Sequence, residues 1–304
     1  MRRITVREYK IGEGLFGKRV IALGFFDGVH LGHREILADA VKTARELSLP
    51  SAVFTFSSIT GTAKDSGQIY SAEKKAELIE ECGIDELIIA DFDSLKSLSP
   101  EDFIEKTLVS DLGCALALCG FDFRFGYRAM GNAELLEREL KRLGSSLICH
   151  GEVTADGEKI SSTRIKALLC EGKVKRAGEL LGKPYSVNGR VEHGLGLGKT
   201  FGFPTLNTEI EEGAAPLKRG VYKCEVTVDG RTHPALSNVG VCPTVGDRKK
   251  HIETYLIDLK EDLYGKDIVI SFLDFIRPEE RFNSVDDLIM QIKLDINTAF
   301  GQKE

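Results

Sequence analysis

Residues 19–48 read "RVIALGFFDGVHLGHREILADAVKTARELS". The apolar run "RVIALG" at the start has the composition of a buried strand, and "HREILADAVKTARELS" at the end has the spacing of an amphipathic helix. The same order returns three times: "SAVFTF" (51–56) then "SAEKKAELIEECG" (71–83), "ELIIADF" (86–92) then "SPEDFIEKTLVSDLG" (99–113), and "ALALCGF" (115–121) then "NAELLERELKRLG" (132–144). This alternation predicts an α/β domain with a parallel sheet covered by crossover helices, which presents its ligands at the carboxyl ends of the strands.

The second half of the chain has a different pattern. Short β-rich runs follow one another with turn signals between them: "SVNGRVEHG" (186–194), "VYKCEVTV" (221–228), "THPALSNVG" (232–240), "HIETYLIDL" (251–259) and "IVISFLDF" (268–275). Such spacing predicts an antiparallel barrel or sandwich. We place the boundary at Lys183 and Pro184, which gives domains 1–183 and 184–304.

A single helix is expected at the end of the chain, in "SVDDLIMQIKLDINTAF" (284–300). Ser284 and Asp287 have the spacing of a capping box. One apolar face is predicted from Val285, Leu288, Ile289, Ile292, Ile296 and Ala299.

Composition limits the partners. The 304 residues carry 41 Lys+Arg against 47 Asp+Glu, so the chain is mildly acidic and does not suit the nucleic-acid backbone or an anionic membrane. The seven cysteines are odd in number and lack a C-x-x-C pair, which predicts reduced core thiols. No leader-like or membrane-spanning apolar run is present in the sequence. We expect a soluble cytoplasmic protein, a monomer or weak homo-oligomer, that acts on small molecules.

The first candidate site lies on the turn from the first strand into the first helix. The turn carries Gly24, Phe26, Asp27, Gly28, His30 and His33. Backbone N–H groups and the positive end of a helix favour an anion at such a place. Two imidazoles three residues apart can donate hydrogen bonds to charge that develops on a phosphorus atom. The alternative is that both histidines are ordinary surface or capping residues.

The whole string "GFFDGVHLGH" (24–33) resembles the G-x-F-D-G-x-H-x-G-H signature of nucleotidylyltransferases. These enzymes transfer a nucleoside monophosphate from ATP to a phosphate ester and release pyrophosphate. The resemblance implies that "KISSTRIKALL" (159–169) is a second phosphate-binding segment, in which Ser162, Thr163 and Arg164 open a helix; a plain helix cap is the alternative. In "CGFDFRFGYRAMGN" (119–132), Asp122 and Asn132 are candidate contacts to the nucleotide.

The glycine-rich stretch "HGLGLGKTFGFPT" (193–205) is not a P-loop. That motif needs its first glycine at position 193, which is histidine, and a helix after the lysine, which Gly202 and Pro204 would break. A flap between strands is the better interpretation, because missing Cβ atoms let backbone amides approach phosphates. The candidate binding residues of this flap are Gly194, Gly196, Gly198 and Lys199.

The longer string "GRVEHGLGLGKTFGFPTLNT" (189–208) resembles the riboflavin kinase signature. The resemblance implies that Thr205 and Asn207 hold Mg²⁺ and the phosphates of ATP. In "NVGVCPTVGDRKKHIETYLIDLKEDLYGKDIVISFLDFIRPEERF" (238–282) it assigns Glu253 as the general base and places Arg277 in a ligand-binding segment. Without the resemblance, Glu253 would be interpreted as the solvent-facing half of an alternating strand.

Together the two halves resemble the bifunctional riboflavin kinase and FAD synthetase family of bacteria. The resemblance implies a Rossmann-like nucleotidylyltransferase domain and a C-terminal riboflavin kinase-like barrel, with ATP as co-substrate, Mg²⁺ as cofactor and riboflavin, FMN and FAD as substrates and products. One segment departs from the family: "SSITGTAKDSGQIYS" (57–71) has neither the histidine nor the proline that is usual there. Two alternatives therefore remain, a kinase with a weakened or repurposed first domain and a non-catalytic flavin- or nucleotide-sensing protein.

Overall fold

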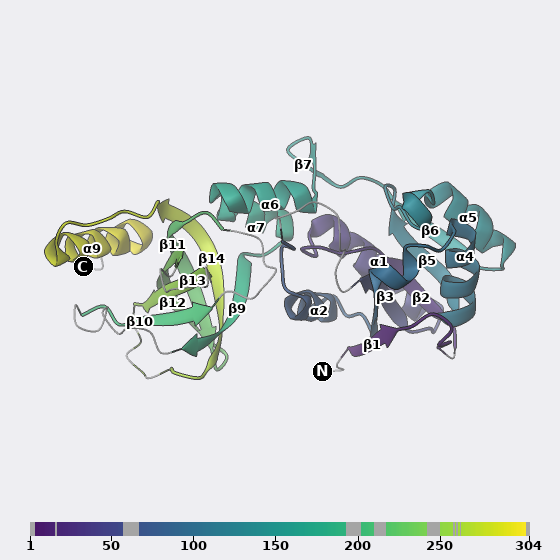
Figure 1. The fold of residues 1–304 in the computed structure, drawn as a ribbon, viewed down its shortest axis with the longest axis horizontal. Coiled ribbons are helices and arrows are strands. Elements are labelled where there is room, and N and C mark those ends of the chain that lie inside the picture. Colours follow the sequence, from purple (N-terminus) through teal and green to yellow (C-terminus); the bar gives the residue numbers. More distant parts are fainter. Residues whose placement is uncertain are drawn as a thin grey trace. The chain divides into compact units, whose positions relative to one another are not determined.

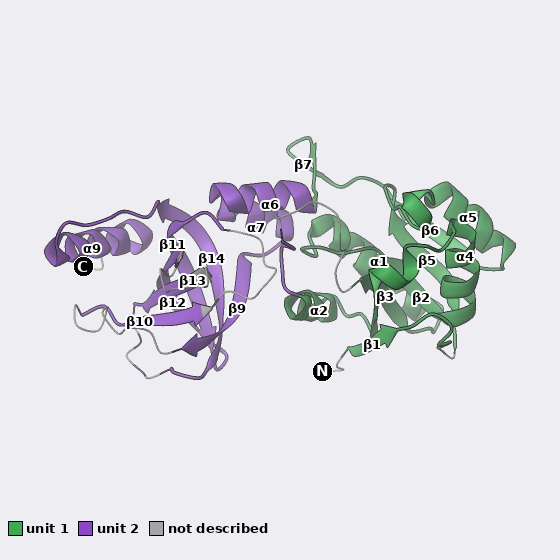
Figure 2. Cartoon of the chain, viewed as in Figure 1, with its two compact units in different colours: residues 1–65, 72–161 green, residues 66–71, 162–304 purple. Residues whose placement is uncertain are grey.

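The computed structural model describes residues 4–15, 17–56, 67–192, 202–209, 217–241, 250–257, 259, 261 and 263–301. The chain divides into two compact units, residues 1–65 with 72–161 and residues 66–71 with 162–304 (Figure 2). The predicted boundary between two activities, near residue 183, remains a prediction, since compactness alone does not assign function to the helices between 162 and 183.

The first unit is built on one parallel sheet of six strands in the order β1-β4-β3-β2-β5-β6. Figure 1 shows helices packed around this sheet. The strands are β1 Thr5–Tyr9, β2 Arg19–Leu23, β3 Ser51–Phe56, β4 Glu86–Ala90, β5 Cys114–Gly120 and β6 Ser146–His150. The predicted parallel sheet is confirmed. The strand order reverses at β2, whose neighbours are β3 and β5. In open parallel sheets, ligands bind at such a switch point, which here lies at the carboxyl ends of β2 and β5.

Helices connect these strands. They are α1 Leu31–Glu46, α2 Ala72–Glu81, α3 Phe92–Leu95, α4 Pro100–Asp102, the π-helix η1 Phe103–Asp111, the 3₁₀ turn η2 Tyr127–Ala129 and α5 Ala133–Arg142. A short hairpin of β7 Thr154–Ala155 and β8 Glu158–Lys159 completes the unit.

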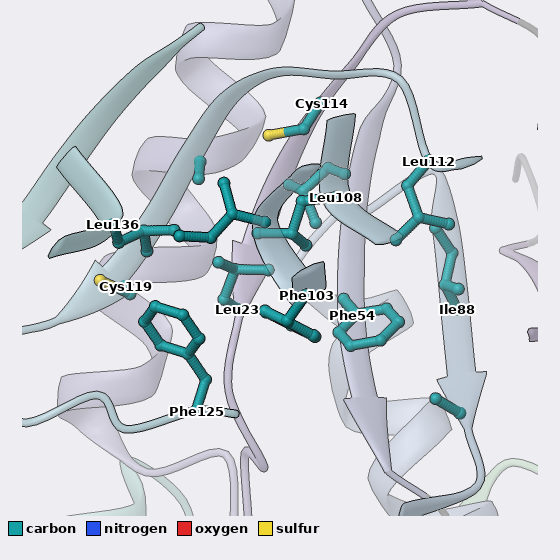
Figure 3. Packing of buried hydrophobic residues seen from close by; sticks show 14 of the residues in the cluster. Leu23, Phe54, Ile88, Phe103, Leu108, Leu112, Cys114, Cys119, Phe125 and Leu136 are labelled. Atoms are coloured by element: carbon teal, nitrogen blue, oxygen red, sulfur yellow. The ribbon is translucent and has the colours of Figure 1, made fainter. Parts of the chain in front are cut away.

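A continuous apolar cluster holds the sheet against its helices (Figure 3). Leu23 and Phe54 come from neighbouring strands, and Phe103 and Leu108 come from the π-helix; none of the four is more than 3% exposed. Burial of such side chains contributes about 1.5–3 kcal/mol each. The cluster therefore fixes the strand ends from which the functional turns extend.

The second unit is a closed antiparallel barrel in the order β10-β13-β12-β11-β14-β9. Its strands are β9 Tyr185–Glu192, β10 Thr205–Glu209, β11 Gly220–Val228, β12 Arg231–Val241, β13 Lys250–Leu256 and β14 Asp267–Arg277. The barrel closes because β9 pairs with both β14 and β10. This finding decides between the barrel and the sandwich that the strand pattern left open.

In the described part of the second unit, the helices are α6 Ser162–Glu171, α7 Val174–Leu181 and α9 Val285–Phe300. The predicted cap of the last helix is confirmed, since the Ser284 side chain accepts a hydrogen bond from the Asp287 N–H at 3.1 Å. The predicted apolar face is wrong at its first position, because Val285 is 45% exposed. Its last position is confirmed, since Ala299 is buried and packs with Ile296, and the helix also buries a charged residue, Asp295.

The cysteine expectation holds only in part. All cysteines in the described part of the chain are free thiols, and Cys114, Cys119 and Cys224 are buried as predicted. Cys149 and Cys170 are exposed, which corrects the prediction of core positions for them. Among the described residues, no helix has the length and apolar character to cross a bilayer.

Candidate functional site

The turn between β2 and α1 has an unusual backbone. Gly24 follows the strand, and a Cβ there would lie 3.1 Å from the ring of Phe26, so a larger residue would require that ring to shift. Phe26 itself has a φ of +54°, and Gly28 and Val29 follow with φ of +86° and +43°. A non-glycine residue in this region costs on the order of 1–3 kcal/mol and persists only where its surroundings fix it. The strained turn places His30 at the N-cap of α1.

The two histidines form one stacked unit at the start of that helix. The Nδ1 atom of His30 accepts a hydrogen bond from the backbone N–H of His33 at 3.3 Å. The imidazole rings stack with centroids 3.6 Å apart and an interplanar angle of 16°, and the Phe26 ring meets His33 edge-on at 5.2 Å. Because Nδ1 of His30 accepts, the proton of its neutral ring is on Nε2. Nδ1 of His33 is buried and has no hydrogen-bond partner among the described residues.

Burial keeps both imidazoles neutral. It lowers the pKa of His30 to about 4, with a smaller contribution from the charge of Lys159. The pKa of His33 lies well below its usual value because of burial and the neighbouring His30 and Lys75. At pH 7 both imidazole rings are therefore neutral.

The free energy of unfolding is expected to fall as the pH is lowered from 6.5 towards 4. In this interval the unfolded chain binds a proton on His30 that the folded chain does not, so acid favours unfolding; above pH 6.5 the effect is absent. At 1.36 kcal/mol per pK unit, His30 alone lowers the free energy of unfolding by about 3 kcal/mol across this interval. Urea unfolding of the protein and of His30→Asn, which keeps a capping side chain, measures the difference. Equal pH dependence in both proteins would contradict the assignment.

The neighbouring loop at the switch point follows β5. Asp122 is exposed and forms an ion pair with Lys159 of the β7–β8 hairpin, and both charges act on the pKa of His30. Asp27 is buried in the first turn, at 5% exposure. The structure thus brings Asp27, Asp122 and the histidine pair to one end of the sheet. Their contacts with a nucleotide remain predictions.

Asn132 lies at a helix start. Its side chain accepts a hydrogen bond from the N–H of Leu135 at 2.9 Å and so caps α5. A contact between Asn132 and a nucleotide remains a prediction. Ser162, Thr163 and Arg164 open α6, the first helix of the second unit, whereas the histidines belong to the first unit. Their proposed grip on phosphate also remains a prediction.

The second candidate site lies on the barrel, across three neighbouring strands. Asn207 of β10 pairs directly with Glu253 of β13, which pairs directly with Asn238 of β12. Directly opposed residues project to the same face of a sheet with Cβ atoms about 5 Å apart. Thr205 lies two residues from Asn207 and therefore shares this face. The predicted residues Thr205, Asn207 and Glu253 are thus brought together.

This row faces outward from the barrel. The alternate positions Thr208, Thr254 and Ser237 are fully buried, and the last two share a hydrogen bond of 2.9 Å inside the barrel. Glu253 is exposed. A carboxylate that is open to solvent between two amide side chains can take a proton from a bound alcohol. Sequence reasoning missed Asn238, although the N-x-G element that it opens was visible.

Other predicted barrel residues have different outcomes. Gly194, Gly196, Gly198 and Lys199 lie outside the described residues. Arg277 ends β14, and its guanidinium forms hydrogen bonds of 2.9–3.1 Å with both carboxylate oxygens of buried Asp295. It therefore anchors α9 to the barrel, and a role in ligand binding stays a prediction. The described residues contain no cluster of three His, Cys, Asp or Glu side chains that would hold a metal ion.

Comparisons with known proteins match the two parts of the chain, each with one candidate site, to two different families. A family model for FAD synthetase matches residues 15–164, and one for riboflavin kinase matches residues 181–301. A *Haemophilus influenzae* protein named bifunctional riboflavin kinase/FMN adenylyltransferase is 36% identical over 285 residues, which cover 92% of each chain. Proteins of that name from *Listeria monocytogenes* (91% of this chain, 90% of its own) and *Escherichia coli* K12 (92% and 91%) are each 35% identical.

One solved structure resembles the chain over its whole length. It comes from *Streptococcus pneumoniae*, is described as a macrolide-efflux protein, and has a TM-score of 0.89 at 30% identity. The match covers 99% of this chain and 100% of the other. The likeness extends over both units and therefore supports the fold of each.

Proposed function

Because this chain belongs to the bifunctional riboflavin kinase/FMN adenylyltransferase family, we propose that one polypeptide converts riboflavin to FMN and FMN to FAD. Riboflavin and ATP give FMN and ADP on the barrel. FMN and a second ATP give FAD and pyrophosphate in the first unit. The observation that carries the two-step assignment is that each unit has a polar site of its own, the histidine stack in the first and the Asn207–Glu253–Asn238 row in the second.

On the barrel, Glu253 is the general base. Its exposed carboxylate accepts the proton of the terminal ribityl hydroxyl as that oxygen attacks the γ-phosphorus of ATP. The new O–P bond forms while the bond to the β,γ-bridging oxygen breaks, and ADP leaves. Asn207 and Asn238 flank the carboxylate, and their amides orient the hydroxyl and the phosphate.

In the first unit, the phosphate oxygen of FMN attacks the α-phosphorus of the second ATP, and pyrophosphate leaves. The reaction passes through no covalent enzyme intermediate. His30 and His33 lie at the amino end of α1, where the helix dipole and unpaired N–H groups favour anions. Neutral imidazoles stabilise the charge that develops on the phosphate oxygens by donating hydrogen bonds, and they need no proton from solvent to do so.

On the barrel, Thr205 and Asn207 would hold Mg²⁺ through their side-chain oxygens. The hydroxyl of Thr205 and the side-chain oxygen of Asn207 share one face of β10, and Mg²⁺ prefers oxygen ligands while keeping several waters and substrate phosphates. When bound, the ion neutralises charge on the phosphate oxygens of ATP.

The sequence of products tests the proposal. Purified protein is incubated with riboflavin, ATP and MgCl₂, and the flavins are separated by chromatography over time. FMN should appear first and FAD should follow as FMN declines. FMN alone would show that the first domain is weakened or repurposed, and unchanged riboflavin with measurable binding would show a sensing protein; either result overturns the two-step proposal.

A further inference from the structure

Lys75 of α2 has a buried ammonium group next to the strained turn. The residue is 3% exposed. Its Nζ donates to the carbonyl of Phe56 at 3.1 Å, to the carbonyl of Phe25 at 3.3 Å and to Oγ1 of Thr55 at 3.4 Å. It also lies 4.5 Å from the centroid of the Phe25 ring. Burying a charge is costly unless its donors are satisfied, and here the three donors of the ammonium have three acceptors.

The carbonyl of Phe25 is the point that these contacts fix. It accepts a second hydrogen bond, from the buried hydroxyl of Thr55, at 2.9 Å. The residue that follows is Phe26, whose φ of +54° needs support from its surroundings. Two donors on the preceding carbonyl supply that support, and they tie the turn to the carboxyl end of β3.

From Phe26 the contacts continue to the reacting groups. The ring of Phe26 packs edge-on against His33, and His33 stacks on His30. A rotation of the Phe25–Phe26 peptide would move the Phe26 ring and with it the face on which His33 rests. Lys75 is therefore connected to the histidine pair through packed groups, while its own ammonium donates to the carbonyls of Phe25 and Phe56 and to Oγ1 of Thr55.

The positive charge of Lys75 also affects His33 and the proposed phosphate site. Burial lowers the pKa of Lys75 to about 8 while the nearby Asp27 opposes this shift, so most of the ammonium is charged at pH 7. The same charge contributes to the low pKa of His33. A positive group next to the turn also favours phosphate anions bound there.

We propose that Lys75, together with Thr55, is a positioning residue for adenylyl transfer: it clamps the Phe25 carbonyl and thereby holds the strained turn and the His30–His33 stack in the reactive arrangement. This inference rests on the proposed function of the first unit. It assigns a role to a lysine outside the turn motif itself.

The test compares Lys75→Met with Lys74→Met in the full-length protein. Lys74 is the matched control, since it is the adjacent lysine, is 6% exposed and pairs with Glu77 of its own helix at 2.8 Å. Lys75→Met should lower kcat for FAD formation by on the order of 100-fold, the effect of an ångström-scale misplacement. The KM for FMN and riboflavin phosphorylation should stay within about threefold of the unaltered protein. Thr55→Val should give a smaller loss, and Lys75→Arg should recover part of it.

An NMR titration of the histidine ring protons gives a readout that does not depend on turnover. Lys75→Met should displace the His30 and His33 signals, and Lys74→Met should not. Retention of FAD formation by Lys75→Met, or an equal loss of both reactions, would overturn the inference. Absence of FAD with the unaltered protein would instead refute the proposed function, so the two failures are distinguishable.

Discussion

Replacing Glu253 by glutamine is expected to lower kcat for FMN formation by about 10³-fold, within the range that a positioned general base contributes. Glutamine has nearly the same shape and keeps the β13 pairing, but it cannot accept the proton of the ribityl hydroxyl. Conversion of added FMN to FAD should be unchanged, because that reaction belongs to the other unit. Flavin chromatography with riboflavin and with FMN as separate substrates measures both rates in one preparation.

Glu225→Gln is the matched control for this experiment. Glu225 is also an exposed carboxylate on a barrel strand, β11, and it lies opposite Pro234 and Ser271 rather than between two amides. Its removal changes net charge by the same amount and should leave both reactions intact. If Glu225→Gln slowed FMN formation as much as Glu253→Gln, the effect would be electrostatic and general. If Glu253→Gln kept its kinase activity, another base would have to be found.

The Asn207–Glu253–Asn238 row shows how far a sequence can predict a site whose residues are brought together by strand pairing. The residue types and the matched strings around Thr205, Asn207 and Glu253 were sufficient to name these three. The sequence did not reveal the register of strands β10, β12 and β13. A shift of one residue in that register would turn each side chain to the opposite face of the sheet. Asn238 was missed for the same reason, since only its position opposite Glu253 reveals it.

The parallel sheet was predictable where its strands are buried on both faces. Strand β2 is apolar after Arg19, and β3 is apolar except for Ser51 and Thr55, so the sequence pattern identified both. The edge strand β1 was missed, because "TVREY" is mostly polar and only Tyr9 is buried, with its hydroxyl donating to Asp111 at 2.6 Å. An edge strand exposes most of its side chains and so loses the apolar signal.

At the first site, the sequence identified the residues of the turn but not the backbone conformation or the neighbouring residue that hold the turn in place. Glycines and histidines in "GFFDGVHLGH" pointed to a phosphate turn, but nothing in the string indicates that Phe26 and Val29 adopt positive φ. Lys75 lies in the charged run "AEKKAELIEE", where the ordinary expectation is a solvated helix face. Tertiary packing reverses that expectation, since the helix turns this lysine towards the carbonyls of Phe25 and Phe56.

Loss of the imidazole pair should have the opposite effect to Glu253→Gln: FAD formation should be lost and FMN formation kept. The variant His30→Asn with His33→Phe keeps a capping side chain at the start of α1 and an aromatic ring against Phe26, but it has no imidazole N–H. Each donor to a developing phosphate charge is worth about 10²–10³-fold in kcat, so FAD formation should fall by at least about 10³-fold. Riboflavin phosphorylation should be unaffected. The comparison with His30→Ala and His33→Ala, which also removes the cap, measures the part of the loss that is structural.

Proton uptake on ATP binding by the unaltered protein distinguishes donation by neutral imidazoles from donation by imidazolium. Burial keeps the pair neutral at pH 7, but bound triphosphate favours the protonated ring, so ATP binding competes with desolvation for a proton. Calorimetric titration with ATP in two buffers of different ionisation enthalpy counts the protons taken up. With neutral donors the count is near zero at pH 7 and rises as the pH approaches the pKa of about 4. Uptake of a full proton at pH 7 that disappears in the double variant would show that the phosphates charge the stack, and the catalytic group would then be an imidazolium.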